Sequence, residues 1–101
     1  MHYVICYDLE NDRLRDRCAK LLERNGCRRA QKSVFAAANM ANKDLVKVQL
    51  GLRQLFARMP MSPGDSLLII PLPHDYAGEI ETFGDNNIRT ELLEKRLKTI
   101  L

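Results

Sequence analysis

The sequence has no paired cysteine motif and no long apolar run, and both absences exclude whole classes of protein. Its three cysteines are an odd number without a CxxC spacing, which predicts neither a disulfide framework nor a zinc site. No apolar run approaches the ~20 residues needed to cross a bilayer, and no signal peptide, internal repeat or low-complexity tract is recognisable. We therefore expect a cytoplasmic protein without a membrane partner, in which Cys6 and Cys18 are small core residues.

Neither sign of charge is in large excess over the whole chain, but many of the basic residues lie close together within residues 13–32. The chain of 101 residues suits a single domain, and its net charge is +3, from 16 Lys and Arg against 13 Asp and Glu. Within residues 13–32 only Asp16 and Glu23 oppose a larger basic set. That set is Arg13, Arg15, Arg17, Lys20, Arg24, Arg28, Arg29 and Lys32. Such a local excess attracts polyanions, although a solvated helix face has the same pattern.

Apolar periodicity and turn residues divide the chain into alternating strands and helices. β-branched and aromatic residues predict a strand over residues 2–7, and helical spacing predicts an amphipathic helix over residues 12–25. Residues 28–37 are extended in character, as one strand or as a tight hairpin. The later elements are a helix that starts at Asn39 or Asn42 and ends before the turn at 59–65, a buried strand at 66–72, a weaker strand at 79–83, and a tail at 88–101 with apolar residues at helical spacing.

This order of elements implies an open sheet with two helices packed on one face. The strand at residues 2–7 is expected near the centre of the sheet. The opposite face also needs a cover, and the candidates to lie on it are Tyr3, Ile5, Tyr7 and Phe35. A dimer joined sheet to sheet would bury such a face.

A single carboxylate, Asp8, ends the first expected strand. Acids are disfavoured inside strands, and open sheets place ligands beyond the strand ends, so Asp8 is a candidate site residue as well as a candidate turn former or helix cap. One carboxylate makes a poor magnesium site, because hard cations need several oxygen ligands. Two copies of Asp8 facing each other across a two-fold axis would repel unless a cation or a proton lay between them.

The segment YVICYDLENDRLRDRCAKLLERNGCRRAQKSVF and the later DSLLIIPL together resemble the small CRISPR-associated protein of the spacer-acquisition module, the partner of the CRISPR integrase. The shared features are a strand ending in Tyr-Asp, an arginine-bearing helix, a glycine near its end, an Arg-x-Gln-x-Ser-Val-Phe segment and an Asp-Ser-apolar strand. The match covers residues 2–72, and EIETFG looks like the family's exchanged strand.

The resemblance implies a fold and an oligomeric state. The fold would be a ferredoxin-like α+β domain over residues 1–84, with an open sheet of four to five mainly antiparallel strands and two helices on one face. Residues 85–101 would be a C-terminal extension that contacts a partner or the second subunit. The family pattern is a homodimer in which the two sheets face each other.

The resemblance also implies site residues. Asp8 matches the acid at the dimer axis, where the pair from two subunits holds Mg²⁺ or Mn²⁺, and Tyr7 matches the aromatic residue before it. Ser33 and Phe35 match a Ser-x-Phe pair near the cleft, which completes the candidate catalytic set. Arg15 and Arg17 match helix positions associated with nucleic acid, and Arg29 matches a basic strand position. Together with the basic set described above, the candidate nucleic-acid contacts are Arg13, Arg15, Arg17, Arg28, Arg29 and Lys32. Many members carry an acid where this chain has Ala36, which leaves one fewer oxygen near the cleft and weakens the case for catalysis.

Two functions remain open, and the sequence slightly favours a scaffold over an enzyme. The scaffold would be a non-catalytic bridge between integrase dimers that supports double-stranded DNA. The enzyme would be a metal-dependent endonuclease that cuts double-stranded DNA or single-stranded RNA at the Asp8 pair; a toxin-like ribonuclease of similar fold is a weaker alternative. A nuclease would be expected to hold a His or Lys near the metal, but His2 begins the strand that Asp8 ends, ~20 Å away, and His74 lies in a polar loop.

Overall fold

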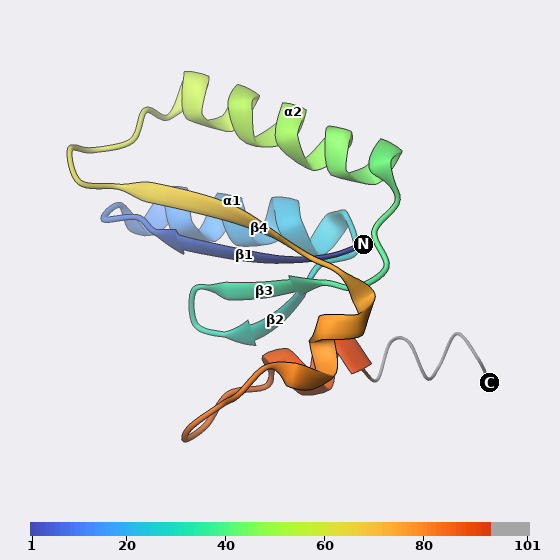
Figure 1. Ribbon diagram of the computed structural model, residues 1–101. Helices are drawn as coiled ribbons and strands as arrows, with labels where there is room; N and C mark the ends of the chain where they lie inside the picture. Colours follow the sequence, from blue (N-terminus) through green and yellow to red (C-terminus); the bar gives the residue numbers. More distant parts are fainter. Residues whose placement is uncertain (94–101) are drawn as a thin grey trace.

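A computed structural model of the chain describes residues 1–93 and shows a four-stranded antiparallel sheet with two helices. The strand order is β2-β3-β1-β4, and Figure 1 shows both helices on the same side of the sheet. The elements are β1 (His2–Asp8), α1 (Asp12–Arg24), β2 (Arg28–Gln31), β3 (Val34–Ala37), α2 (Asn42–Arg58), β4 (Ser66–Leu72) and the 3-10 helix η1 (His74–Glu79). The expected α+β open sheet and the internal position of β1 are confirmed.

Local sequence signals explain where α1 begins and ends. The side chain of Asn11 accepts a hydrogen bond from the backbone N–H of Leu14 at 3.0 Å, which caps the first turn. Gly26 follows the helix with a φ of 87°, a left-handed conformation that suits glycine. These two residues set the length of α1 and hence the position of its side chains relative to the end of β1.

Residues 28–37 form a hairpin, which decides between the two alternatives left open by the sequence. β2 and β3 are antiparallel, with Arg29 opposite Phe35 and an irregularity between Arg29 and Gln31. Lys32 and Ser33 form the connecting turn. The turn lies beside the end of β1, because the backbone N–H of Tyr7 donates to the carbonyl oxygen of Ser33 at 3.1 Å.

The large side chains of β1 face the helices, so the expectation for the second face of the sheet is wrong. Tyr3, Ile5, Tyr7 and Phe35 are all buried in one cluster with the apolar side of α1 and α2. Strand alternation therefore turns the even-numbered residues of β1, including Cys6, toward the opposite face, which we call the open face. Burial in the larger core between sheet and helices removes more aromatic surface from water than a single sheet face could.

β4 is an edge strand rather than the buried strand that its apolar run predicted. Leu68 and Ile70 remain 57% and 44% exposed on the open face. Pro71 lies near the end of this edge strand, as expected for a residue without a backbone donor. The predicted weaker strand at residues 79–83 is wrong, since within residues 1–93 this segment belongs to no strand and only Glu79 is in the 3-10 helix.

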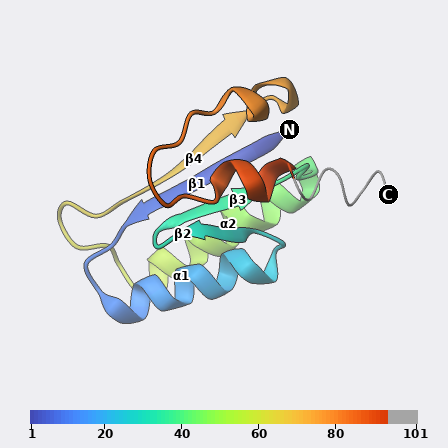
Figure 2. The same ribbon diagram turned by 90° about the horizontal axis from the view of Figure 1, so that it is seen from below.

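The segment after β4 covers part of the open face. Figures 1 and 2 show it folding back beneath β1, β3 and β2, on the side away from the helices. Ile88 and Leu92 are buried there in a second cluster with Ala30 and Ala36. The predicted tail helix begins at Ile88, while Leu97 and Ile100 lie outside the described residues. Within residues 1–93 no helix is long and apolar enough to span a membrane.

Candidate nucleic-acid interface and carboxylate site

Asp8 lies at the last position of β1, where its side chain is exposed. Its partner on β4 is Ser66, at the first position of that strand. Because side chains alternate along a strand, Asp8 shares the open face with Cys6, whereas Tyr7 points into the core beneath α1. The structure therefore separates Asp8 from Tyr7 by the thickness of the sheet, although the two are adjacent in sequence.

The described part of one chain does not supply a metal site around Asp8. Within residues 1–93, no three side chains of His, Cys, Asp or Glu gather closely enough to hold an ion. Mg²⁺ and Mn²⁺ are bound by several oxygen ligands, so Asp8 fits such an ion only with carboxylates from a second copy. A metal site at Asp8 therefore requires the proposed dimer.

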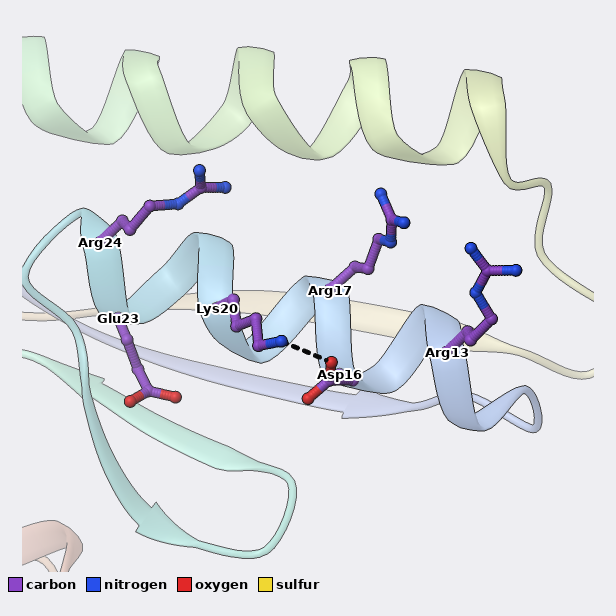
Figure 3. Close-up of a pocket in the computed structure, with 6 residues that line it drawn as sticks. All are labelled: Arg13, Asp16, Arg17, Lys20, Glu23 and Arg24. Atoms are coloured by element: carbon purple, nitrogen blue, oxygen red, sulfur yellow. Dashed lines mark ion pairs between the residues drawn. The ribbon is translucent and has the colours of Figure 1, made fainter.

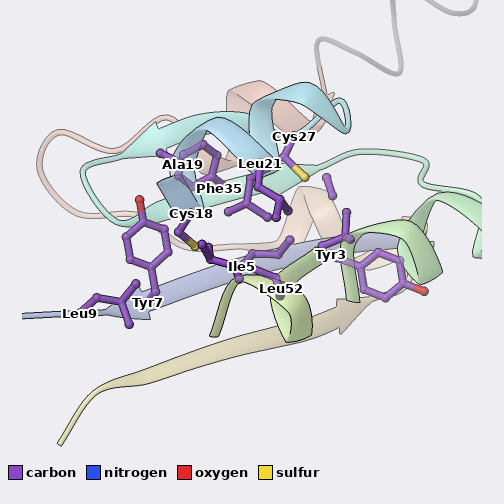
Figure 4. Packing of buried hydrophobic residues seen from close by; sticks show 14 of the residues in the cluster. Tyr3, Ile5, Tyr7, Leu9, Cys18, Ala19, Leu21, Cys27, Phe35 and Leu52 are labelled. Atoms are coloured by element: carbon purple, nitrogen blue, oxygen red, sulfur yellow. The ribbon is translucent and has the colours of Figure 1, made fainter. Parts of the chain in front are cut away.

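Tyr7, Phe35 and Arg29 form a stack beside the end of β1. The Tyr7 and Phe35 rings are stacked with centroids 6.0 Å apart, and the Arg29 guanidinium carbon lies 4.9 Å from the centre of the Phe35 ring. Figure 4 shows Tyr7 at the margin of the core cluster, with Phe35 inside it. Phe35 is fully buried, so it orients its two neighbours and does not itself contact a ligand from solvent.

A small hollow of about 190 Å³ brings together five of the predicted site residues. Its lining includes Tyr7, Ser33, Arg15, Arg29 and Lys32. Within the described chain the Tyr7 hydroxyl has no hydrogen-bond partner, and burial raises the pKa of this phenol, with a smaller contribution from Cys18, while Arg29 and Arg15 oppose the shift. Asp12 and Asp16 also line the hollow, and Asp12 pairs with Arg15, so two carboxylates partly offset its three cations.

Several of the basic residues predicted to contact nucleic acid are already engaged by the chain. Arg15 donates to the backbone carbonyls of Leu9 at 2.8 Å and Glu10 at 3.0 Å, and it also pairs with Asp12. Arg28 pairs with Glu91 at 2.7 Å. These contacts give Arg15 a structural role in holding the loop between β1 and α1.

Arg13 and Arg17 have a different environment, on the flank of α1 that faces α2. Together with Arg24 they line a hollow of about 600 Å³, and Figure 3 shows all three extending toward the α2 side of the helix. Among residues 1–93 none of the three makes an ion pair. Lys20 also lines the hollow but pairs with Asp16 at 3.0 Å. We call Arg13, Arg17 and Arg24 the α1 row.

Arg24 belongs to the basic set of residues 13–32 but was not among the candidate nucleic-acid contacts, although a signal for it was present. Arg13, Arg17 and Arg24 occur at positions i, i+4 and i+11, which lie on one face of an α-helix. Arg15 and Arg17 were instead singled out because they match helix positions that the family resemblance associates with nucleic acid.

The two histidines lie far from Asp8, at the other end of β1. His2 is fully buried, and its Nδ1 accepts a hydrogen bond from the backbone N–H of Asn39 at 3.0 Å. The rings of His2 and His74 meet edge to face with centroids 4.6 Å apart. His74 is therefore a packing partner of His2 and not simply a solvated loop residue, and neither histidine is a base for chemistry at Asp8.

Comparisons with known proteins identify the family. The family model for CRISPR associated protein Cas2 matches residues 1–80. A hypothetical protein, TT1823, from Thermus thermophilus is 29% identical and has a similar structure, with a TM-score of 0.65 over 84% of this chain and 92% of that one. Cas2 of Streptococcus pyogenes, 24% identical, shares the fold with a TM-score of 0.66 over 83% of this chain and 100% of that one. No curated protein matches the chain. The open antiparallel sheet with two helices, together with the family match over most of the chain, shows that this protein belongs to the Cas2 family of CRISPR-associated proteins and is a component of CRISPR adaptation.

Proposed function

We propose that the protein acts as a homodimeric DNA-binding scaffold that bridges integrase dimers during spacer acquisition. The observation that carries this proposal is the α1 row, three arginines on one helix face without an ion pair among the described residues. A cation that no carboxylate neutralises is available to a phosphate, and each such contact releases counterions from the DNA.

The length of the α1 row suits the backbone of a duplex. From Arg13 to Arg24 the helix rises about 16 Å, at 1.5 Å per residue. One strand of B-DNA carries a phosphate about every 3.4 Å along its axis, so the row extends along about five phosphates. Contacts to phosphates position a protein without reading sequence, which is what a scaffold for spacers of any sequence requires.

The alternative function is a metal-dependent endonuclease centred on Asp8. Its support is the exposed position of Asp8 at a strand end, where a second copy could bring another carboxylate. Tyr7 and Ser33 line a hollow on the helix side of the sheet, so they do not surround Asp8 of the same chain. Magnesium or manganese bound between two Asp8 side chains would supply an activated water and stabilise charge on the phosphate. The arrangement within one chain favours the scaffold.

Charge reversal of the α1 row tests the DNA-binding part of the proposal. We expect Arg13→Glu with Arg17→Glu to weaken binding of a short duplex and to flatten the dependence of log K on log salt concentration by about 2 per chain, because two phosphate contacts are lost. The measurement is fluorescence anisotropy of a labelled duplex over a series of salt concentrations.

A matched control separates this row from a general charge effect. Lys43→Glu with Arg53→Glu changes the net charge by the same amount on the exposed side of α2, away from the hollow. We expect the salt dependence of this control to stay close to that of the wild type. Equal losses in both variants would show that only the net charge matters and would remove the α1 row as a binding site.

Asp8→Ala distinguishes scaffold from nuclease. We expect it to abolish any magnesium-dependent cleavage while spacer acquisition with the integrase continues, because the Asp8 side chain is exposed at the end of β1 and its replacement leaves the backbone pairing with Ser66 in place. The two measurements are cleavage of labelled DNA or RNA and the yield of integrated spacers. Loss of acquisition in a folded, dimeric variant would contradict the scaffold and support the enzyme.

A further inference from the structure

The outward side of α2 carries a second regular row of residues, besides the row that packs into the core. In both rows the spacing along the helix alternates between three and four positions. The inner row is Leu45, Val48, Leu52, Leu55 and Met59, and the outer row is Lys43, Val46, Leu50, Arg53 and Ala57, here called the outer seam. Every residue of the outer seam is exposed, and this spacing is the repeat with which two α-helices pack along each other.

The middle of the outer seam is apolar and open to solvent. Val46 is 49% exposed and Leu50 is 50% exposed, and they lie one turn apart on the helix. Leu50 is two positions before the buried Leu52, so the two leucines point to opposite sides of α2. Figure 1 shows α2 as the outermost element on the helix side, with no other element of residues 1–93 beyond it. Val46 and Leu50 are therefore not a margin of the core.

A cation lies on either side of this apolar pair. Lys43 is one turn before Val46 and Arg53 is one turn after Leu50, and neither cation makes an ion pair within residues 1–93. The single acid of α2, Asp44, is half-buried and lies outside the outer seam. The seam thus combines apolar contact surface with positive charge and has no carboxylate of its own.

A second copy of α2 does not fit this pattern. Parallel pairing of two outer seams would bring each Lys43 and each Arg53 against its own equivalent. Antiparallel pairing would bring Lys43 against Arg53 at both ends. Like charges in contact oppose association and serve to reject wrong partners, so the seam disfavours its own copy in either direction.

DNA uses only part of the outer seam. Phosphates attract Lys43 and Arg53, but Val46 and Leu50 gain nothing from contact with a phosphate backbone. A helix that carries both apolar and acidic side chains satisfies all four residues at once. Helices of this kind are recognised through anchors one turn apart along one face.

We infer that the outer seam is a docking site for an acidic amphipathic α-helix of a partner protein. Its apolar side chains would cover Val46 and Leu50, and one carboxylate would lie beside each of Lys43 and Arg53. These two cations are ten positions apart, about 15 Å along the helix, and that spacing sets the register of the partner. The site is on α2 and does not depend on the proposed binding of DNA to α1.

A designed peptide tests the site on the full chain. The probe is a helical peptide with the pattern Glu-x-x-Leu-x-x-x-Leu-x-x-Glu, which matches the spacing of the outer seam, and its counterpart has lysine in place of the two glutamates. We expect a dissociation constant of about 10–100 μM for the glutamate peptide, as for a small interface, and binding about tenfold weaker for the lysine peptide. Isothermal titration calorimetry measures both, and circular dichroism verifies that both peptides are helical.

Substitutions separate the apolar contribution from the charge. Leu50→Ser should weaken the glutamate peptide about tenfold, because the apolar contact at the centre is lost. Tyr76→Ser is the control, since it removes another exposed large side chain, 55% exposed in η1, and should leave peptide binding unchanged. Both positions are exposed, and circular dichroism verifies that each variant is folded.

Charge reversal provides the sharper test. Lys43→Glu with Arg53→Glu should invert the preference, so that the lysine peptide binds more tightly than the glutamate peptide. The matched control is Arg13→Glu with Arg17→Glu, which changes the net charge by the same amount on α1 and should keep the preference for the glutamate peptide.

Each other outcome overturns the docking site. No binding at ~1 mM, equal binding of the two peptides, or a preference that does not invert removes the acidic helix as the occupant. Loss of duplex binding in the Lys43→Glu and Arg53→Glu variant would assign the seam to nucleic acid, and loss of self-association in Leu50→Ser would assign it to a second copy. Failure of the peptide with an intact response of the α1 row to duplex DNA would leave the proposed scaffold standing, so the two proposals fail separately.

Discussion

Arg15 and Arg17 are two residues apart on α1, yet the fold gives them different partners. Arg15 turns back to the loop after β1 and donates to two backbone carbonyls there. Arg17 extends toward the α2 side of α1, lines the larger hollow there and makes no ion pair among residues 1–93. A position on a helix therefore decides whether an arginine stabilises the chain or is available to a phosphate.

Arginine-to-alanine substitutions at these two positions should separate stability from DNA binding. Arg15→Ala leaves two carbonyls without their charged donor, and because the side chain is 35% exposed we expect the free energy of unfolding to fall by only about 1 kcal/mol. Arg17→Ala should change it by less than ~0.5 kcal/mol but weaken duplex binding. Urea unfolding and duplex titrations check both values; equal stability losses would contradict the structural role of Arg15.

Because of the buried thiol of Cys18, we expect the free energy of unfolding to fall in alkaline solution. Burial raises the pKa of this thiol from 9.0 to about 11. Above pH 9 the unfolded chain releases the Cys18 proton while the folded chain keeps it until about pH 11, so this group lowers stability as the pH rises through that window. At pH 10.5 the effect is about 2 kcal/mol relative to pH 8.

The measurement compares urea unfolding of the wild type and Cys18→Ala at pH 8 and pH 10.5. The alanine variant loses packing at both values, but the difference between the two proteins should shrink by about 2 kcal/mol at the higher pH. The other titrating groups are shared and cancel, apart from Tyr7, whose pKa is also raised by Cys18. A difference that is independent of pH would show that the Cys18 thiol is accessible to water in the folded state.

At the scale of single residues, the sequence indicated which residues are candidates for a site better than it indicated which partners their side chains contact. Asp8 is recognisable because an apolar strand ends at it, and alternation alone indicates that Tyr7 lies on the other face. The partners of Arg15 and Arg28 could not be predicted, because they come from the β1–α1 loop and from Glu91, which is 63 positions away from Arg28. Contacts of this kind depend on the tertiary fold.

At the scale of elements, long periodic segments were predictable and short ones were not. α1 and α2 follow their apolar spacing closely. The β2–β3 hairpin was left undecided because its turn, Lys32-Ser33, contains no glycine, proline or asparagine. The exposure of β4 was missed because a continuous apolar run does not distinguish a central strand from an edge strand.

Close packing of α1 against α2 depends on a glycine in the middle of α2. A Cβ atom at Gly51 would lie 2.9 Å from Cδ1 of Leu21, at the end of a flexible side chain. We expect Gly51→Ala to be tolerated, because Leu21 can move and alanine favours the helix by about 1 kcal/mol. Gly51→Leu should lower the free energy of unfolding by about 1–3 kcal/mol, because the two helices must separate. Thermal or urea unfolding measures both, and similar stability of the two variants would contradict close packing here.

At the scale of the whole molecule, the two sides of the sheet carry different surfaces. The helix side presents the α1 row, which extends toward the α2 side of α1. The open face presents Leu68 and Ile70 beside the segment of residues 85–93. Neither surface is apparent from a net charge of +3, since the sum over the chain hides how the basic residues are distributed.

Because the sheet separates these surfaces, DNA binding and dimerisation should respond to different substitutions. The Arg13→Glu and Arg17→Glu variant should bind duplex DNA poorly but dimerise with a dissociation constant within about twofold of the wild type, since sites without shared partners act independently. Sedimentation equilibrium without DNA measures the dimer, and anisotropy measures the duplex. If charge reversal on α1 shifted the dimer equilibrium about tenfold, the α1 row would lie at the subunit interface, and the assignment of DNA to the helix side and of the second copy to the open face would both be wrong.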